Sequence, residues 1–132
     1  MAITAKDVQA LRQATGVGMM DAKRALEENN GDFDASVQWL RVQGLASAAK
    51  RADRENTEGC VAVVKDGDSA AVVELKCETD FGAKSEEFVT LADEMAAAVA
   101  TDGDGAVAQF TSRIETLLTT LKENIEVGTV RR

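Results

Sequence analysis

Residues 58–79, EGCVAVVKDGDSAAVVELKCET, decide the fold of this chain. Two runs rich in β-branched residues flank Asp-Gly-Asp-Ser at 66–69, and this pattern is typical of a two-stranded hairpin. The second run alternates between apolar and polar residues, and its apolar face consists of Val73, Leu75 and Cys77. A strand pair with one apolar face requires other elements to cover it, so we predict an α+β fold with an antiparallel sheet.

Two helices and a final strand are predicted after the hairpin. We expect Ser85 to cap a helix whose buried face consists of Phe88, Leu91, Met95 and Val99. The segment TDGDG at 101–105 interrupts the pattern. A second helix should then bury Val107, Phe110, Ile114, Leu117 and Leu121. NIEVGTV, at 124–130, predicts a last strand, so the order of elements is ββααβ.

The residues before the hairpin predict a bundle of three short helices. Thr4 is expected to cap the first helix, with Asp7 three residues further on and with Ile3 and Val8 forming a hydrophobic staple. The second helix should bury Met19, Ala22 and Leu26. Asp32 is expected to cap the third helix, which should bury Phe33, Val37 and Leu40 and end at Gly44.

Residues 45–56, LASAAKRADREN, are rich in alanine and charge and contain neither glycine nor proline. This composition predicts a helical linker. We therefore divide the chain into a three-helix bundle at 1–44, a helical linker at 45–56 and an α+β core subdomain at 57–132.

Charge and hydropathy bear on partners and location. Residues 1–54 carry eight basic and seven acidic side chains, whereas residues 55–132 carry seven and sixteen. The excess of acidic residues in the second part of the chain disfavours direct binding to nucleic acid. No apolar run approaches 18 residues, so no membrane span is expected. The first residues mix both charges, unlike a signal peptide, and we expect a cytoplasmic protein.

The sequence gives little support for catalysis. It has no histidine, the commonest general base, and no phosphate-binding glycine loop, so we expect neither an enzyme nor a bound cofactor. The two Asp-Gly turns lack the further ligands of a calcium loop, so we expect no metal. Cys60 and Cys77 lie in strands that could pair, which leaves a cross-strand disulfide open. The favoured interpretation is two reduced thiols that act as small apolar residues.

Two features are candidates for protein binding. Met19 and Met20 give a soft apolar patch at a helix start, and core packing is the alternative interpretation. Asp80 and Phe81 follow the hairpin, and helical spacing back from Phe88 would place Phe81 in the core. The glycine at 82 and the cap at Ser85 instead indicate a loop, in which Phe81 would be an exposed wedge. Trp39 lies off the main apolar stripe, so we expect it either to pack against the linker helix or to lie half exposed, and we assign it no function.

Two motifs carry a resemblance to a known family. TGVGMMDAKRAL at 15–26 and TDFGAK at 79–84 occur in the order and at the separation found in bacterial elongation factor Ts, and the chain resembles that family. The resemblance is dense to residue 95, thins over 96–119 and returns at LKENIEV, 121–127. The chain matches the family's N-terminal domain and one core subdomain, and we interpret it as a short or truncated form.

The resemblance implies a function without bond chemistry. The family promotes guanine-nucleotide exchange on elongation factor Tu, and its N-terminal domain is a bundle like a ubiquitin-associated domain. In the family this bundle contacts the partner's GTPase domain through residues that match Arg12, Met19, Met20 and Lys23. The pair that matches Asp80 and Phe81 inserts near the magnesium and phosphate site, with the ring wedged between two helices. Compact members act as homodimers.

Two departures from the family pattern affect the implied site. Gly82 replaces the usual valine, which we expect to loosen the backbone behind Phe81. Lys122 replaces a glycine whose neighbour, matched here by Leu121, also lies near the magnesium site. An alternative function is therefore a GTPase-docking or general protein-binding module without exchange activity. A thiol redox protein using Cys60 and Cys77 is a third class, which their spacing disfavours.

Overall fold

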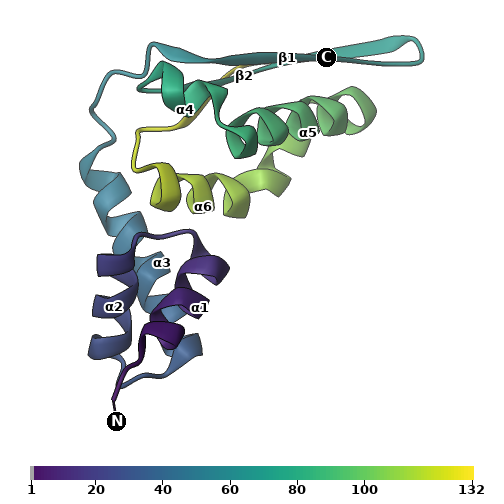
Figure 1. Cartoon of the computed structure of the whole chain (residues 1–132). Coiled ribbons are helices and arrows are strands. Elements are labelled where there is room, and N and C mark those ends of the chain that lie inside the picture. The colour runs from purple at the N-terminus through teal and green to yellow at the C-terminus, as the bar shows by residue number, and fades with distance from the viewer. Residues whose placement is uncertain (1) are drawn as a thin grey trace.

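The computed structural model describes residues 2–132, and Figure 1 shows a helical bundle below a sheet that is covered by further helices. The bundle contains α1 (Ala5–Thr15), α2 (Met19–Glu28) and α3 (Phe33–Lys50). The remaining elements are β1 (Glu58–Asp66), β2 (Ser69–Cys77), α4 (Asp80–Lys84), α5 (Glu86–Asp102), the 3-10 helix η1 (Asp104–Phe110), α6 (Thr111–Leu121) and β3 (Glu126–Arg131). The predicted α+β class is confirmed.

Helix α1 begins with the reciprocal cap that the sequence predicts. Thr4 Oγ1 accepts a hydrogen bond from the Asp7 amide at 3.2 Å, and the Asp7 carboxylate accepts one from the Thr4 amide at 3.0 Å. These bonds satisfy amides that an uncapped first turn would leave without partners. Ile3 packs against the bundle core, which consists of Val8, Leu11, Val17, Ala22, Ala25, Leu26 and Leu40.

Two residues that helical spacing assigned to the bundle core lie at its surface instead. Ala22 and Leu26 are buried as predicted, but Met19 is 58% exposed and Phe33 is 41% exposed. Met19 is the first residue of α2 and Phe33 is the first residue of α3. At the end of a helix fewer neighbouring turns are available to cover a side chain, so the apolar spacing alone overestimates the burial of these two residues.

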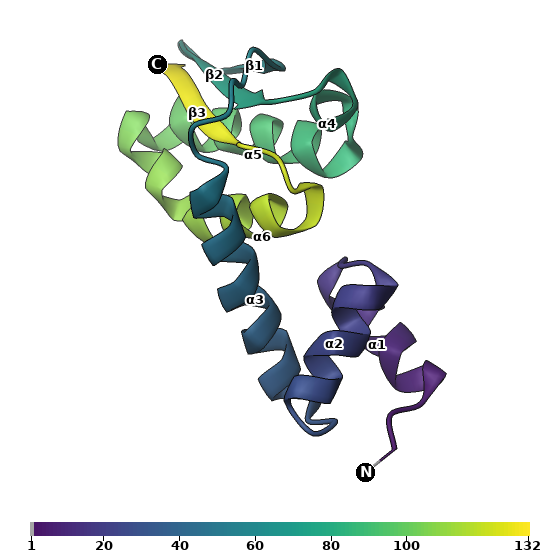
Figure 2. The same cartoon turned by 90° about the vertical axis from the view of Figure 1, so that its left-hand side faces the viewer.

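The helix end predicted at Gly44 is wrong, because α3 continues to Lys50 (Figure 2). A Cβ atom at residue 44 would lie 2.6 Å from Thr119 Cγ2 of α6. Glycine therefore allows α3 and α6 to approach closely, and it costs the helix about 1 kcal/mol relative to alanine. Turns follow at 51–54, so the helical part of the predicted linker ends earlier than expected.

The elements follow one another as ββααβ, apart from the short helices α4 and η1, and both strand pairs are antiparallel, as predicted. In space the strand order is β1-β2-β3. Gly67 and Asp68 form the two-residue turn between Asp66 and Ser69, and Gly67 has a φ of 60°, which glycine adopts readily. The predicted inner face of β2 is fully buried. Helices α4, α5 and α6 lie on that side of the sheet (Figure 1).

Helix α5 buries the apolar face that its spacing predicts, with Phe88, Leu91, Met95 and Val99 in the larger core. Ser85 stands at its N-cap position, but the Ser85 hydroxyl donates to the Gly82 carbonyl at 2.9 Å rather than capping α5. The single helix predicted after residue 105 is also wrong. It divides into η1 and α6, because the glycine-containing start adopts the tighter 3-10 form.

Candidate partner-binding surfaces

Phe81 stands on a short helix instead of the predicted loop. Helix α4 comprises one turn, and Thr79 caps it by accepting a hydrogen bond from the Gly82 amide at 3.0 Å. The Phe81 side chain is 85% exposed, whereas Phe88 is fully buried. The alternative in which both rings share one apolar face is therefore wrong. The prediction that Phe81 is exposed at the strand-to-helix corner is confirmed.

The surroundings of Phe81 combine a buried base with a charged edge. Gly82 and Ala83 are buried, so the turn that carries the ring is packed against the rest of the subdomain. Asp80 lies on the exposed side, with its Oδ2 atom 3.9 Å from Lys84 Nζ. An exposed pair of this kind contributes little stability, and both charges remain available to a partner.

Methionine side chains form a second exposed apolar feature, at the start of α2. Met20 is 77% exposed, and its neighbour Met19 is also largely exposed. Interpretation of these residues as core filler is therefore wrong. Arg12 is exposed near the end of α1, and Lys23 is exposed one turn into α2, 4.0 Å from Glu27. The bundle thus presents flexible apolar side chains together with basic ones.

The segment after α6 connects the two features. Lys122 Nζ lies 2.9 Å from Asp21 Oδ2, directly after the methionine pair, while Glu123 accepts hydrogen bonds from the residues that precede α4. Leu121 is half-buried and packs against the larger core. In Figure 1 the end of α6 lies between α2 and α4, along the left-hand side. The structure therefore links both candidate surfaces through residues 121–124.

Local sequence patterns could not identify these links. Lys122 and Asp21 are 101 residues apart, and Glu123 is 44 residues from Thr79. The only sequence feature that drew attention to this segment is Lys122, which replaces a glycine of the family pattern. Lys122 adopts a left-handed conformation with φ of 57°, a conformation that favours the glycine of the family pattern.

Polar contacts also join α3 to α6. Arg41 Nη2 lies 2.6 Å from Glu115 Oε2, and Arg51 Nη2 donates to the Leu118 carbonyl at 2.9 Å. The close approach at Gly44 lies between these two contacts along α3. The bundle and the covered sheet are therefore held together along this helix pair as well as through residues 121–124.

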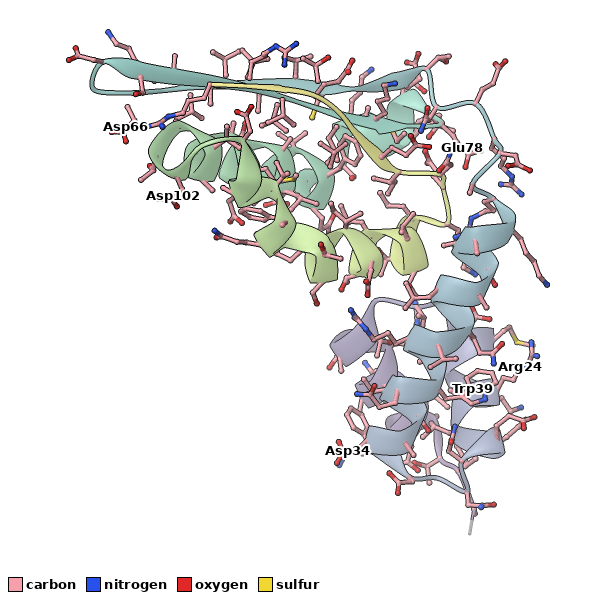
Figure 3. All side chains as sticks on the ribbon, turned by 180° about the vertical axis from the view of Figure 1, so that it is seen from behind. Arg24, Asp34, Trp39, Asp66, Glu78 and Asp102 are labelled. Atoms are coloured by element: carbon pink, nitrogen blue, oxygen red, sulfur yellow. The ribbon has the colours of Figure 1, made fainter. Side chains whose placement is uncertain are left out.

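Trp39 is half-buried, as its position off the main stripe predicts. The guanidinium carbon of Arg24 lies 5.6 Å from the centre of the indole ring, and Figure 3 shows the two side chains together. Such a cation–π contact contributes about 0.5–1 kcal/mol at a partly exposed site. It joins α2 to α3, so the structure gives Trp39 a packing role.

The thiols show no sign of redox activation. Cys60 is partly buried and Cys77 is buried, and both are free. Burial, followed by the Glu123 carboxylate, raises the pKa of Cys77 to about 11, and burial also raises the pKa of Cys60. A reactive cysteine requires the opposite shift, so these pKa values argue against the redox alternative.

Within residues 2–132 no three acidic, cysteine or histidine side chains come together as metal ligands. None of the helices described is long and apolar enough to cross a membrane.

Comparison with known proteins agrees with the two motifs. No family model matches the chain. The chain is 55% identical to elongation factor Ts of Maricaulis maris over 108 residues, which are 82% of this chain and 34% of the relative. It is 48% identical to elongation factor Ts of Nitratidesulfovibrio vulgaris over 130 residues, 97% of this chain and 45% of the relative. It is 49% identical to elongation factor Ts of a Ruegeria species over 126 residues, which are 95% of this chain and 43% of the relative.

The chain therefore spans between a third and a half of the length of these relatives. The matched residues include nearly all of the bundle and the sheet in the longer alignments. Over the residues that it shares with these proteins, the chain belongs to the elongation factor Ts family.

Proposed function

We propose that this chain is a guanine-nucleotide exchange factor for elongation factor Tu. Asp80 and Phe81 would enter the magnesium and phosphate site and promote GDP release. The bundle would dock on the GTPase domain through Arg12, Met19, Met20 and Lys23, with Leu121 near the magnesium site. The same proposal includes a bundle like a ubiquitin-associated domain and the division of the chain at residues 44 and 56.

The observation that supports this proposal most strongly is the exposure of Phe81. The chain has five aromatic side chains, and one of them stands 85% exposed on an anchored turn beside a carboxylate. An exposed aromatic ring contributes little to the stability of the chain itself, but it contributes strongly when a partner buries it. This arrangement suits a side chain that displaces elements of another protein.

The energetics require more than the ring. Accelerating GDP release a thousandfold requires about 4 kcal/mol of extra stabilisation at the release barrier. Burial of one phenylalanine side chain supplies about 2–3 kcal/mol. Exchange also requires tighter binding to the nucleotide-free partner than to the GDP-bound partner. The methionine surface of α2 would supply the remaining binding energy.

Stopped-flow release of a fluorescent GDP analogue from elongation factor Tu tests the proposal. We expect the chain to accelerate release and Phe81→Ala to remove most of the acceleration. Phe33→Ala is a matched control, because Phe33 is also an exposed phenylalanine but lies on α3. Unchanged release with the wild-type chain would reject exchange activity, and equal losses in both variants would reject the specific role of Phe81.

A docking module without exchange activity is the second candidate. The observation that favours it is Lys122, which replaces the family's glycine and forms an ion pair with Asp21. A side chain at this position would hinder the close approach of a partner to the backbone. Stoichiometric binding that survives Phe81→Ala, without faster GDP release, would support this function. The predicted homodimer is a separate question, and sedimentation of the chain at several concentrations would answer it.

A further inference from the structure

A pair of carboxylates ties the corner before α4 to the segment after α6. Glu123 Oε1 accepts hydrogen bonds from the amides of Glu78 and Thr79, both at 2.9 Å. Glu123 Oε2 accepts a third bond from the Thr79 hydroxyl at 2.7 Å. In return, the Glu78 carboxylate accepts the Asn124 amide at 2.5 Å. Figure 3 shows Glu78 where β2 ends and the chain turns toward α4.

These bonds converge on the residue that caps α4. Thr79 Oγ1 donates to Glu123 and also accepts the hydrogen bond from the Gly82 amide. The Glu123 carboxylate therefore fixes the Thr79 side chain, and Thr79 in turn caps the helical turn that holds Asp80 and Phe81. Hydrogen bonds to an ionised acceptor are about twice as strong as those between neutral groups, so this network restricts the corner more than an ordinary turn would.

Gly82 provides the space that this network needs. A Cβ atom at residue 82 would lie 2.7 Å from Glu123 Oε2 and 2.8 Å from Oε1. The glycine that was expected to loosen the corner thus admits the carboxylate that restrains it. The contacts at Glu123 replace the restraint that a larger side chain at this position would give to the backbone.

We infer that Glu123 is a positioning residue for Phe81: it holds α4 in the orientation from which the ring reaches the partner. This inference rests on the proposed exchange function. Glu123 itself lies behind the capping threonine and acts through Thr79. Its loss should lower the rate of GDP release at saturation more than it weakens docking, because the surface on α2 is unchanged.

Two measurements on the full chain test the inference. The first follows amide hydrogen exchange in residues 78–84 without any partner, and we expect about tenfold faster exchange in Glu123→Ala. Glu123→Gln retains an oxygen for the two backbone amides but loses the negative charge and the acceptor for the Thr79 hydroxyl, so its exchange should lie between those of wild type and Glu123→Ala. Glu55→Ala, at an exposed glutamate before β1, is the control for loss of one negative charge.

The second measurement is a double-mutant cycle in the GDP-release assay. Glu123→Ala should lower the saturating release rate about tenfold and change the half-saturating concentration by less than about twofold. If Glu123 acts through Phe81, adding Glu123→Ala to Phe81→Ala should cause little further loss. Thermal unfolding of each variant identifies any general loss of structure.

The outcomes separate the inference from the proposed function. The positioning role would be overturned if the two substitutions lowered the GDP-release rate independently, so that the double variant showed the product of the two reductions. Unchanged amide exchange in Glu123→Ala would overturn it too. Absence of exchange activity in the wild-type chain would instead overturn the proposed function and, with it, the role of Glu123 in exchange. In that case faster amide exchange in Glu123→Ala would still establish the restraint of α4 by itself.

Discussion

At the scale of single residues, Cys77 shows how a reactive side chain becomes a structural one. Its side chain is fully buried on the inner face of β2, and its Sγ atom donates to the Thr79 carbonyl at 3.1 Å. Burial opposes ionisation, and the nearby Glu123 carboxylate opposes it further. The alternation of β2 predicts this burial, but the effect of Glu123 depends on a contact between distant segments.

This environment predicts a loss of stability at high pH. The pKa of Cys77 rises from the ordinary 9.0 to about 11 on folding, so the folded state retains a proton that the unfolded state releases. The stabilising contribution is present below pH 9 and is lost as the pH rises toward 11. Thermal melts should show a smaller decrease in this range for Cys77→Ala than for wild type. Val73→Ala, on the same buried face but without a titratable group, is the control, and equal decreases in wild type and Cys77→Ala would contradict the prediction.

At the scale of secondary structure, the sequence predicts those elements that local chemistry determines. The cap at Thr4, the turn at Gly67 and the buried face of α5 each depend on residues close together in the chain, and the structure contains all three. The end of α3 could not be predicted in this way. A glycine that ends a helix and a glycine that accommodates another helix are identical in the local sequence, and Thr119 is 75 positions further on.

Gly44→Ala tests this explanation. Alanine at an exposed position inside a helix normally stabilises the protein by up to about 1 kcal/mol. At residue 44 the added methyl group would overlap Thr119, so we expect the free energy of unfolding to fall by about 1–3 kcal/mol. Urea denaturation measures the change, and Thr119→Ala in the same chain should restore part of it.

Gly105→Ala provides the matched control for this substitution. Gly105 lies in η1, and an added Cβ atom there would meet nothing within 4 Å. This variant should be as stable as wild type or slightly more stable. A gain of stability in Gly44→Ala would contradict the role of Gly44 in the approach of α3 to α6.

At the scale of the whole molecule, the two candidate surfaces belong to different hydrophobic cores. Helix α2, which presents the exposed methionines, packs into the bundle core. Helix α4, which presents Phe81, packs into the larger core. The proposed function requires both surfaces to reach one partner, so the contacts between α3, α6 and residues 121–124 determine whether they act together. The resemblance carried by the motifs implies that Met19, Met20 and Phe81 contact a partner, although helical spacing wrongly placed Met19 in the core. The connection between the two surfaces depends on pairings across the molecule that no local pattern contains.

Asn124 is the buried member of this connection, and its substitution tests how strongly the two parts are joined. Its Nδ2 atom donates to the carbonyls of Ala52 at 3.2 Å and Arg54 at 2.7 Å, just beyond α3, and the residue is 6% exposed. Asn124→Asp replaces this donor with a carboxylate that faces two carbonyl oxygens, so urea denaturation at neutral pH should show a loss of about 2–4 kcal/mol.

The folded state would raise the pKa of the new carboxyl above its ordinary value of about 4. Stability relative to wild type should therefore recover as the pH falls through this raised pKa, and the recovery should be complete near pH 4, where the unfolded state also becomes protonated. Asn124→Ala is the control, because its loss should not depend on pH in this way. A variant Asn124→Asp as stable as wild type at neutral pH would mean that Asn124 does not hold the end of α3 to the core.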